Sequence, residues 1–398
     1  MSLLFDESLR KLNVMFKISG IYLDRKIQNT FEHILKYRSF YIINFLWLNT
    51  DVIGELLWLI QGAIEGKNLE ELTYIAPCST YCMLANIKAL TLISNEDNIQ
   101  NLFTKLRDME NVGVGEYSRD KEMVVVKMRK YLNVVIQAVK VFSMLTAVLF
   151  SLSPAMLMGL EYSQSGQFKL MLQFMVVYPV DPYDIKYWPF VYLHLVWSTI
   201  LVVSQVAAVD CLFYICCTSI CTQLRLLQYD IETIIPGNTF EVNHFQEKFK
   251  KLILRHQEIM QAVIRLEDIY TKSTLIHFVS SSFLICLTGF NVTTTDDIPC
   301  LLMFLSFLLM SLLQVYFLCF FGDWIMTSSM EVGSAVYNSK WYTVDAKTAR
   351  HLYVVQIRAW KPCKLTAHSY VDVNLKAFTK ILSTSWSYFA LLKTMESP

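Results

Sequence analysis

Seven long apolar stretches constrain the fold of this chain more than any other feature of its sequence. Hydrophobic residues make up 54% of the 398 residues and only 17% are charged, a balance that favours a membrane protein. A helix rises about 1.5 Å per residue and the hydrocarbon core of a bilayer is about 30 Å thick, so each stretch can span it with some tilt. The sequence therefore predicts an all-α membrane protein, a single domain over 1–398 whose seven transmembrane helices lie at about 40–64, 72–94, 131–160, 187–221, 273–290, 298–325 and 373–395.

The positions of Lys and Arg between these stretches predict the orientation of the chain, because basic residues are retained on the cytoplasmic side. Four segments hold 26 of these residues and the other four hold only 3. The basic segments are 1–39, 95–130, 222–270 and 328–372, and the others are 65–71, 161–186, 291–297 and 396–398. We therefore expect a cytoplasmic amino terminus and an extracellular carboxyl terminus. Asn291 opens the only Asn-x-Ser/Thr triplet, falls in a predicted outer loop and is a candidate for glycosylation.

Ionisable side chains inside the predicted spans are rare and costly, so each one calls for a partner or a function. They are Asp51, Glu55, Lys88, Lys140, His194 and Asp210. Lys88 and Asp210 fall close to the predicted cytoplasmic face, where we expect them to reach the membrane surface or to lie in cytosolic extensions of their helices. Asp51 and Glu55 lie one turn apart near mid-span, so they must share a cavity, a water path or a partner cation. A secondary transporter would use such a pair, and that function stays open as an alternative, although no inverted repeat is visible.

The final stretch, 373–395, has two unlike faces when it is drawn as a helix. One stripe is apolar and consists of Phe378, Leu382, Trp386 and Phe389. The other begins polar and ends apolar, with Lys380, Thr384, Ser387, Leu391 and Met395. Hydroxyl and ammonium groups are costly at membrane depth unless they meet a partner or water. We therefore expect this helix to line water inside a membrane assembly, and the alternative is an amphipathic helix that lies on the membrane surface. One such helix cannot enclose a channel, so the pore interpretation requires an oligomer.

Apolar residues at helical spacing, interleaved with Lys and Arg, predict an amphipathic cytoplasmic helix at about 345–360 that ends before Pro362. Signatures of enzymes are missing, since the chain has no HExxH, no GxSxG, no glycine-rich phosphate loop and no CxxC pair with metal spacing. A net charge of +1 does not favour a nucleic-acid partner. We therefore expect no enzymatic activity, no cofactor and no metal site, and the surrounding lipid bilayer is the expected environment.

The segment 362–392 reads PCKLTAHSYVDVNLKAFTKILSTSWSYFALL. A Pro and a Leu-Thr-Ala turn lead into a final helix that holds Phe378, the pair Ile381-Leu382 and the triplet Ser387-Tyr388-Phe389. In these features the end of the chain resembles the insect odorant receptor family, and the chain length, seven helices and orientation extend the resemblance over the whole chain. The related gustatory receptors end in a Thr-Tyr…Gln-Phe motif, from which this chain departs. A gustatory-type receptor channel stays open as a second alternative.

The resemblance implies a ligand-gated, nonselective cation channel in the plasma membrane of olfactory sensory neurons. Its ligand would be a small volatile lipophilic molecule, an odorant or a pheromone. The family assembles as a tetramer around the last helices, usually by combining a ligand-tuning subunit with an odorant co-receptor. The co-receptor carries a long insertion between its fourth and fifth membrane helices, and the connection 222–270 is too short for one. The resemblance therefore implies a ligand-tuning subunit in a hetero-oligomer.

By the family's pattern, the ligand pocket lies in the outer half of the bundle between the second, third, fourth and sixth helices. Counting along those helices selects Tyr81, Phe150, Ser153, Met156, Tyr192, Leu195, Met303 and Phe304. This mainly apolar set suits a lipophilic molecule that is held by shape and by one hydrogen bond at most. The alternative is that aromatic and Met residues at this spacing form ordinary core.

The resemblance also implies a gate in the final helix. Leu391 and Met395 lie one turn apart on the face of Thr384 and Ser387, and they match the positions where the family closes its pore. A narrow apolar constriction sheds its water and stops a hydrated cation. Lys380 and Thr384 would then lie deeper in the conduction path, with Lys380 pointing between subunits. The alternative is that Leu391 and Met395 only pack against a neighbouring helix.

Overall fold

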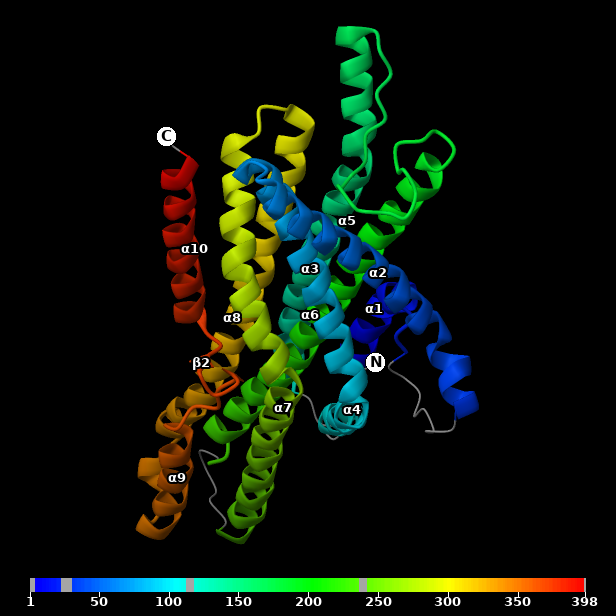
Figure 1. The fold of residues 1–398 in the computed structure, drawn as a ribbon. Helices are drawn as coiled ribbons and strands as arrows, with labels where there is room; N and C mark the ends of the chain where they lie inside the picture. Colours follow the sequence, from blue (N-terminus) through cyan, green and yellow to red (C-terminus); the bar gives the residue numbers. More distant parts are fainter. Residues whose placement is uncertain (1–3, 23–30, 112–117, 236–241, 397–398) are drawn as a thin grey trace.

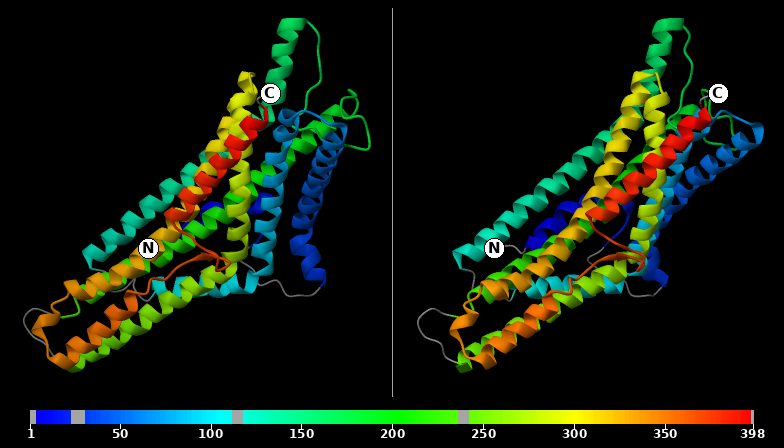
Figure 2. Two further views of the ribbon diagram at one scale, coloured as in Figure 1. Left: turned by 60° about the vertical axis from the view of Figure 1, so that its left-hand side comes forward. Right: turned by 90° about the vertical axis from the view of Figure 1, so that its left-hand side faces the viewer.

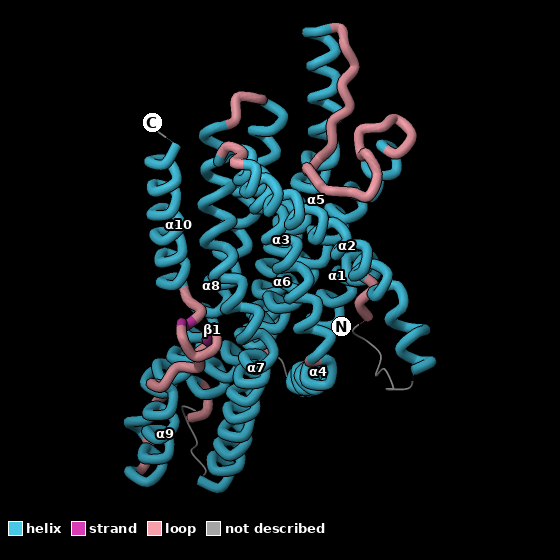
Figure 3. Tube along the Cα trace, viewed as in Figure 1, coloured by secondary structure: helices cyan, strands magenta, loops and turns pink. Residues whose placement is uncertain are grey.

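The computed structural model describes residues 4–22, 31–111, 118–235 and 242–396, and almost all of them lie in helices (Figures 1 and 3). The helices of these ranges are α1 (Leu4–Ser19), α2 (Phe31–Glu65), α3 (Leu69–Ser94), α4 (Glu96–Asn111), α5 (Arg119–Ser165), α6 (Trp188–Glu232), α7 (Val242–Thr294), α8 (Ile298–Asn338), η1 (Trp341–Thr343), α9 (Ala346–Ala359) and α10 (Leu375–Glu396). Two short antiparallel strands, β1 (Thr366–Ala367) and β2 (Val371–Asp372), precede α10. The predicted all-α fold class is therefore confirmed.

Each of the seven apolar stretches lies on a different helix, namely α2, α3, α5, α6, α7, α8 and α10. Within the described ranges, five of these helices are long and apolar enough to cross a membrane by themselves: α2, α5, α6, α7 and α8. The helix α3 packs beside α2, α6 and α7, whereas α10 packs on α7 and α8. The helices α3 and α10 are not among these five.

The centre of the bundle is α6, which runs between α2, α3, α5, α7 and α8 (Figure 1). Every residue from Gln205 to Leu224 is buried, so this part of α6 presents no face to lipid or water. A helix that is apolar on all sides has to lie inside a larger bundle. Its central place explains why the 187–221 stretch shows no polar stripe, in contrast to the stretch at the end of the chain.

Two amphipathic helices, α1 and α4, were not predicted. The helix α1 buries Phe5, Leu12 and Phe16 against α6, and Phe5 makes an edge contact with Phe103 of α4, with 5.0 Å between the ring centroids. Their apolar residues recur at intervals of three and four, which is the helical signal. They are too short and too polar to be found by a search for membrane spans. The predicted amphipathic helix at 345–360 corresponds closely to α9.

The structure divides its buried apolar residues into two clusters. The large cluster joins α1, α4, α9 and the adjoining parts of α5, α6, α7 and α8, and it reaches the base of α10. The small cluster occupies the other end of the bundle, between α2, α3, α5, α6 and α8. Figure 2 shows that the end with α9 and the beginning of α7 projects beyond α2 and α3. We call these clusters the large core and the small core.

The four segments that the charge count places outside lie together at the end of the molecule that holds the small core. They are the α2–α3 turn, the long connection after α5, the α7–α8 turn and the end of α10 (Figure 1). The helices α4 and α9 and the start of α7 lie toward the other end. The bundle therefore has the two-ended arrangement that the distribution of basic residues requires.

The chain enters α10 through a close approach to α8. A Cβ atom on Gly322 would lie 2.2 Å from the carbonyl oxygen of Val373, so only glycine fits there. The turn between β1 and β2 is fixed on α7, because the backbone amide of His368 donates to Oγ1 of Thr271, at 2.7 Å. The hydroxyl of Thr271 donates in turn to the carbonyl of Thr366, at 3.0 Å. These contacts hold the base of α10 against both α7 and α8.

Candidate functional site

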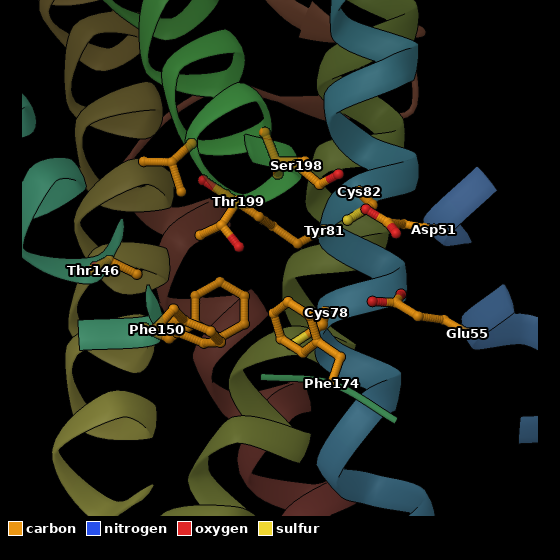
Figure 4. Close-up of a pocket in the computed structure, with 13 residues that line it drawn as sticks. Asp51, Glu55, Cys78, Tyr81, Cys82, Thr146, Phe150, Phe174, Ser198 and Thr199 are labelled. Carbon is orange, nitrogen blue, oxygen red and sulfur yellow. The ribbon is translucent and has the colours of Figure 1, made fainter. Parts of the chain in front are cut away.

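A cavity of about 40 Å³ lies in the small core, between α2, α3, α5, α6 and α8 (Figure 4). Its described lining comprises Asp51 and Glu55 from α2, Cys78, Tyr81 and Cys82 from α3, Thr146 and Phe150 from α5, Ser198, Thr199, Val202 and Val203 from α6, Phe307 from α8, and Phe174 from the segment before α6. Five helices and one connecting segment thus meet around a single space, which is where membrane bundles hold small molecules.

One wall of the cavity is aromatic. Phe150 makes an edge contact with Phe307, with 5.6 Å between the ring centroids, and its ring lies 5.8 Å from that of Phe174. Phe307 also contacts Tyr81 edge-on at 5.1 Å, and the hydroxyl of Tyr81 accepts a hydrogen bond from Nε2 of Gln314, at 2.8 Å. Edge contacts of this kind fix ring positions while leaving apolar faces for a ligand.

The opposite wall is acidic. Asp51 and Glu55, one helical turn apart on α2, are only 2% and 1% exposed, and both side chains point from α2 toward α3 and α6 (Figure 4). Oε2 of Glu55 accepts a hydrogen bond from Oγ of Ser79, at 2.7 Å. The expectation that the two carboxyl groups share a cavity agrees with this arrangement.

A third partner of the acidic wall is the segment that connects α5 to α6. The hydroxyl of Tyr178 donates to Oδ1 of Asp51, at 3.1 Å, and Nδ1 of His194 lies 2.8 Å from the same oxygen. The backbone amide of Val177 donates to the carbonyl of Gly54, at 3.2 Å. A Cβ atom on Gly54 would lie 2.3 Å from Cγ1 of Val176, so the segment fits against α2 only because this residue is glycine. This segment, 172–178, contributes Phe174 to the lining of the cavity.

The cavity is smaller than a typical volatile organic molecule. A volume of about 40 Å³ has room for a few waters, each of which needs at least about 10–15 Å³ on the same measure. A molecule with eight to ten heavy atoms therefore enters only if the aromatic side chains or the 172–178 segment move. The size of the cavity depends on the positions of Phe150, Phe174 and Phe307, which line it.

The structure brings five of the eight sequence-predicted pocket residues together in the small core: Tyr81, Phe150, Leu195, Met303 and Phe304. Of the eight, Tyr81 and Phe150 line the cavity. Ser153 is buried beside them, and its hydroxyl lies 3.4 Å from Sδ of Met303. The hydroxyl of Tyr192 donates to the carbonyl of Ser151, whereas Met156 is 46% exposed and lies outside the cluster.

Sequence counting missed most of the lining on α3 and α6. Ser198, Thr199, Val202 and Val203 follow one another at helical spacing on α6, and Cys78 and Cys82 do so on α3. Small and hydroxyl-bearing residues at such intervals are the available signal, because they leave space between helices where large residues would fill it. Asp51 and Glu55 were singled out, but they were not placed in the pocket set.

Lys88 and Asp210 form an ion pair deep in the bundle. Each is 3% exposed, and the Nζ atom of Lys88 donates to Oδ1 of Asp210. The prediction that these side chains reach the membrane surface is wrong, because each satisfies its charge with the other across α3 and α6. Sequence counting treated them singly and could not pair residues that are 122 positions apart.

The helix α10 lies at the edge of the bundle, with one face packed and one face open (Figure 1). Ala377, Ile381 and Ser385 are buried against α7 and α8, and Tyr388 stacks on Phe283 of α7 at 5.7 Å between centroids. The side chains of Lys380, Ser387, Leu391 and Met395 are exposed, and Thr384 is half-buried. Trp386, a member of the predicted apolar stripe, is 71% exposed, so this stripe is only partly packed against the bundle.

Asn291 lies inside the bundle. It is 2% exposed, and its Nδ2 atom donates to the carbonyl of Thr73, at 2.8 Å. A glycan is attached through this nitrogen, and here the nitrogen is buried and occupied. The candidate glycosylation site is therefore not presented to solvent in this conformation.

A bundle of membrane-length helices around a small, mainly apolar cavity defines an all-α membrane protein. Residues 68–386 match the family model described as "7tm Odorant receptor", so the chain belongs to this family of seven-helix membrane proteins. Odorant receptor 67c of Drosophila melanogaster is 24% identical over 367 residues, which cover 91% of this chain and 89% of the relative. The resemblance noted at the end of the chain is thus confirmed over most of its length.

Two solved structures share the fold. The insect olfactory receptor OR5 from Machilis hrabei, in complex with eugenol, superposes with a TM-score of 0.83 and 16% sequence identity, covering 98% of this chain and 99% of that one. A second structure of the same receptor gives a TM-score of 0.81, also at 16% identity, and covers 97% of each chain. These comparisons favour neither a transporter nor a gustatory-type channel.

Proposed function

We propose that this chain is the ligand-tuning subunit of an odorant-gated, nonselective cation channel. A small volatile lipophilic molecule, an odorant or a pheromone, binds the cavity of the small core and opens a pore lined by α10. The observation that carries the proposal is the cavity itself, which combines an aromatic wall with a few polar groups inside a receptor bundle. The similar receptor from Machilis hrabei was solved with eugenol, a small aromatic molecule of the class that we propose here.

The open face of α10 supports the pore. Polar and charged side chains at membrane depth are costly unless they face water or a partner. Within the described part of the chain, the hydroxyls of Thr384 and Ser387 bond only to carbonyls of their own helix, and the side chain of Lys380 is exposed. Neighbouring subunits or a water-filled path would supply the remaining partners. Leu391 and Met395 extend the same side toward the end of the helix, where they form the apolar constriction. Lys380 points between subunits.

The helix α8 connects the cavity with α10. Phe307 lines the cavity, and nine residues further along α8, Tyr316 makes an edge contact with Phe378 of α10, with 5.6 Å between centroids. Gly322 of the same helix holds the entry to α10. A ligand that displaces Phe307 therefore acts on the helix that also positions the pore. The expected opening motion is a separation of the α10 helices around the axis.

The assembly and its location follow from the same proposal. The chain combines with an odorant co-receptor in a hetero-oligomer, a tetramer, in the plasma membrane of olfactory sensory neurons. Its amino terminus is cytoplasmic and its carboxyl terminus extracellular. A tag before Met1 should bind antibody only after cells are permeabilised, whereas a tag after Pro398 should bind on intact cells, and the opposite pattern would refute this orientation.

Expression in an odour-insensitive cell line tests the function. The chain is expressed with and without an insect odorant co-receptor, and whole-cell current is recorded during an odorant panel. We expect ligand-evoked cation current that requires both subunits. Uptake of a substrate without conductance would instead support a transporter, and current without the co-receptor would refute the hetero-oligomer.

Substitution of Leu391 tests the gate. Leu391→Ser should raise the current in the absence of odorant, because a hydroxyl lets water remain in the constriction. Leu392→Ser is the matched control, since Leu392 is the next residue, points about 100° away around the helix and is half-buried. Equal basal currents in both variants and wild type, at equal surface expression, would remove Leu391 from the pore.

A further inference from the structure

The charge of the cavity lining is unusual for a site that holds apolar molecules. Among the described residues that line it, Asp51 and Glu55 are acidic and none is basic. The buried cation of this region, Lys88, is already paired with Asp210. Among the described basic side chains, His194 is the one that contacts Asp51. It is not a lining residue of the cavity, and its other ring nitrogen, Nε2, is 3.0 Å from the hydroxyl of Thr50. The cavity is therefore mainly apolar, and the two charged residues of its described lining are both acidic.

Polar atoms of the cavity lining are left without partners among the described residues. Oδ1 of Asp51 is held by Tyr178 and His194, but its Oδ2 atom is buried and has no hydrogen bond. The hydroxyl of Ser198, which also lines the cavity, is buried and has none either. A buried carboxylate oxygen without a donor carries a large desolvation cost, which a donor from a bound molecule would remove.

The walls of the cavity are arranged for a molecule with two unlike ends. Asp51 and Glu55 enter from α2, and Ser198 lies across from them on α6, whereas Phe150 is on the far side (Figure 4). An alkylammonium group has three N–H donors and no acceptor. It can therefore meet a carboxylate oxygen, a second carboxylate and a hydroxyl at once, while its carbon chain contacts the aromatic wall.

We propose that the ligand of this cavity is a small volatile amine, bound as the ammonium ion between Asp51 and Glu55. This proposal rests on the proposed function, since it names the ligand class of the same site. Hydrogen bonds between an ammonium ion and carboxylates are charge-assisted and about twice as strong as neutral ones. Aldehydes and esters offer only acceptors, which would face the carboxylate oxygens without a donor between them. The acidic wall thus selects amines and works against carbonyl compounds.

Matched ligands of equal size test the proposal. Benzylamine, benzyl alcohol and benzaldehyde form one series, and hexylamine, hexanol and hexanal form another. Current is recorded from cells that express the chain with the co-receptor, and thermal unfolding of the purified chain is measured with each compound. We expect the amine of at least one series to act at a concentration about tenfold or more below its alcohol, in keeping with a charge-assisted bond, and the aldehyde to be weakest.

Isosteric substitutions test whether Asp51 and Glu55 bind the amine. Asp51→Asn and Glu55→Gln should each weaken the amine about tenfold or more and leave the alcohol within a few-fold. Glu71→Gln is the control, because Glu71 is an exposed carboxylate on α3. Ser198→Ala, which removes an unpartnered hydroxyl, is a second test to be used if Asp51→Asn or Glu55→Gln does not reach the cell surface. It should weaken the amine without lowering the unfolding temperature of the free chain.

The two proposals fail in different ways. An amine that raises the unfolding temperature but evokes no current upholds the ligand class and refutes the channel. Current that is evoked equally by all three members of a series, and that is unchanged in Asp51→Asn and Glu55→Gln, upholds the channel and refutes the amine. If no compound of either series changes the unfolding temperature or the current at millimolar concentration, the amine proposal is wrong.

Discussion

The two cores of this receptor treat buried charge in opposite ways. At the border of the large core, Lys88 and Asp210 satisfy each other across α3 and α6. In the small core, Asp51 and Glu55 lie one turn apart on α2 and line the cavity, and the Oδ2 atom of Asp51 has no hydrogen-bond partner among the described residues. Both pairs are almost fully buried. The difference lies in the partners: Lys88 and Asp210 pair with each other, whereas Asp51 is bonded through one oxygen only, to Tyr178 and His194, and its other oxygen has no hydrogen bond among the described residues.

This contrast separates residues that stabilise the fold from residues that respond to a ligand. A charge that is paired inside the chain contributes to one fixed packing, and its loss is costly. A buried carboxyl group with an unpartnered oxygen can gain a hydrogen bond when a ligand binds. This gain can favour a different conformation of the protein, which is what a receptor requires. We therefore expect substitutions in the large core to act mainly on folding, and substitutions in the small core to act mainly on ligand response.

The largest expected effect comes from breaking the internal pair. Lys88→Met leaves Asp210 buried without a counter-charge and should destabilise the fold by about 3–5 kcal/mol. Surface expression should fall steeply, and the unfolding temperature of the purified chain should drop. The double variant Lys88→Met with Asp210→Leu should recover most of the loss, because an apolar pair of similar volume needs no counter-charge. Normal expression of Lys88→Met would show that the pair does not hold α3 to α6.

A matched pair of phenylalanines sharpens the comparison. Phe321 is fully buried in the large core and stacks on Tyr214, with 4.8 Å between centroids, so Phe321→Ala should cost about 3–5 kcal/mol. Phe150 borders the existing cavity, and Phe150→Ala should cost less and shift the response toward larger odorants. Thermal unfolding and an odorant size series measure the two effects. If Phe321→Ala and Phe150→Ala lose equal stability, and Phe150→Ala keeps the odorant size preference of the wild type, the proposed difference between the two cores is wrong.

A smaller effect is expected where the connecting segment meets α2. In Gly54→Ala the new Cβ atom displaces Val176 and loosens the 172–178 segment over the cavity. We expect a several-fold change in odorant potency with little change in the unfolding temperature. Gly159→Ala is the control, because a Cβ atom there meets nothing within 4 Å. Identical potencies in wild type and both variants would show that this segment does not shape the site.

The smallest effect is expected at the far end of the large core. The Asp345 side chain caps α9, with Oδ2 accepting from the backbone amides of Lys347 and Thr348, at 3.0 and 3.3 Å. The hydroxyl of Thr348 also donates to Asp345 and is the main cause that holds the pKa of this carboxyl below its usual value of 3.8. A lowered pKa stabilises the fold above pH 3.8 and this contribution is lost as the pH falls further. Asp345→Ala should therefore lower the unfolding temperature slightly at pH 7 and progressively less below pH 3.8.

Much of the fold could be predicted from the sequence, because apolar length alone places membrane helices. The stretches 72–94 and 373–395 lie on α3 and α10, although both helices carry polar residues. What could not be predicted depends on contacts between distant residues. The pairing of Lys88 with Asp210 needs the packing of α3 on α6, and the exposure of Trp386 needs the angle at which α10 meets α7 and α8.

The site was predicted less completely than the fold. Tyr81 and Phe150 were selected and line the cavity, whereas Met156 was selected and faces outward. Counting half-helices gives depth in the membrane but not rotation about the helix axis, and rotation decides which side chains face inward. The connecting segment with Phe174 was missed because no periodic pattern marks a loop that folds back into a bundle.

The most direct test is a structure of the chain with its co-receptor and an activating odorant. Density for the ligand should lie between the acidic wall of Asp51 and Glu55 and the ring of Phe150, and Phe307 should move from its position in the free chain. The cavity should be larger than 40 Å³ in the bound state. Ligand density outside the bundle, or at another depth with this cavity unchanged, would contradict the assignment of the small core as the receptor site.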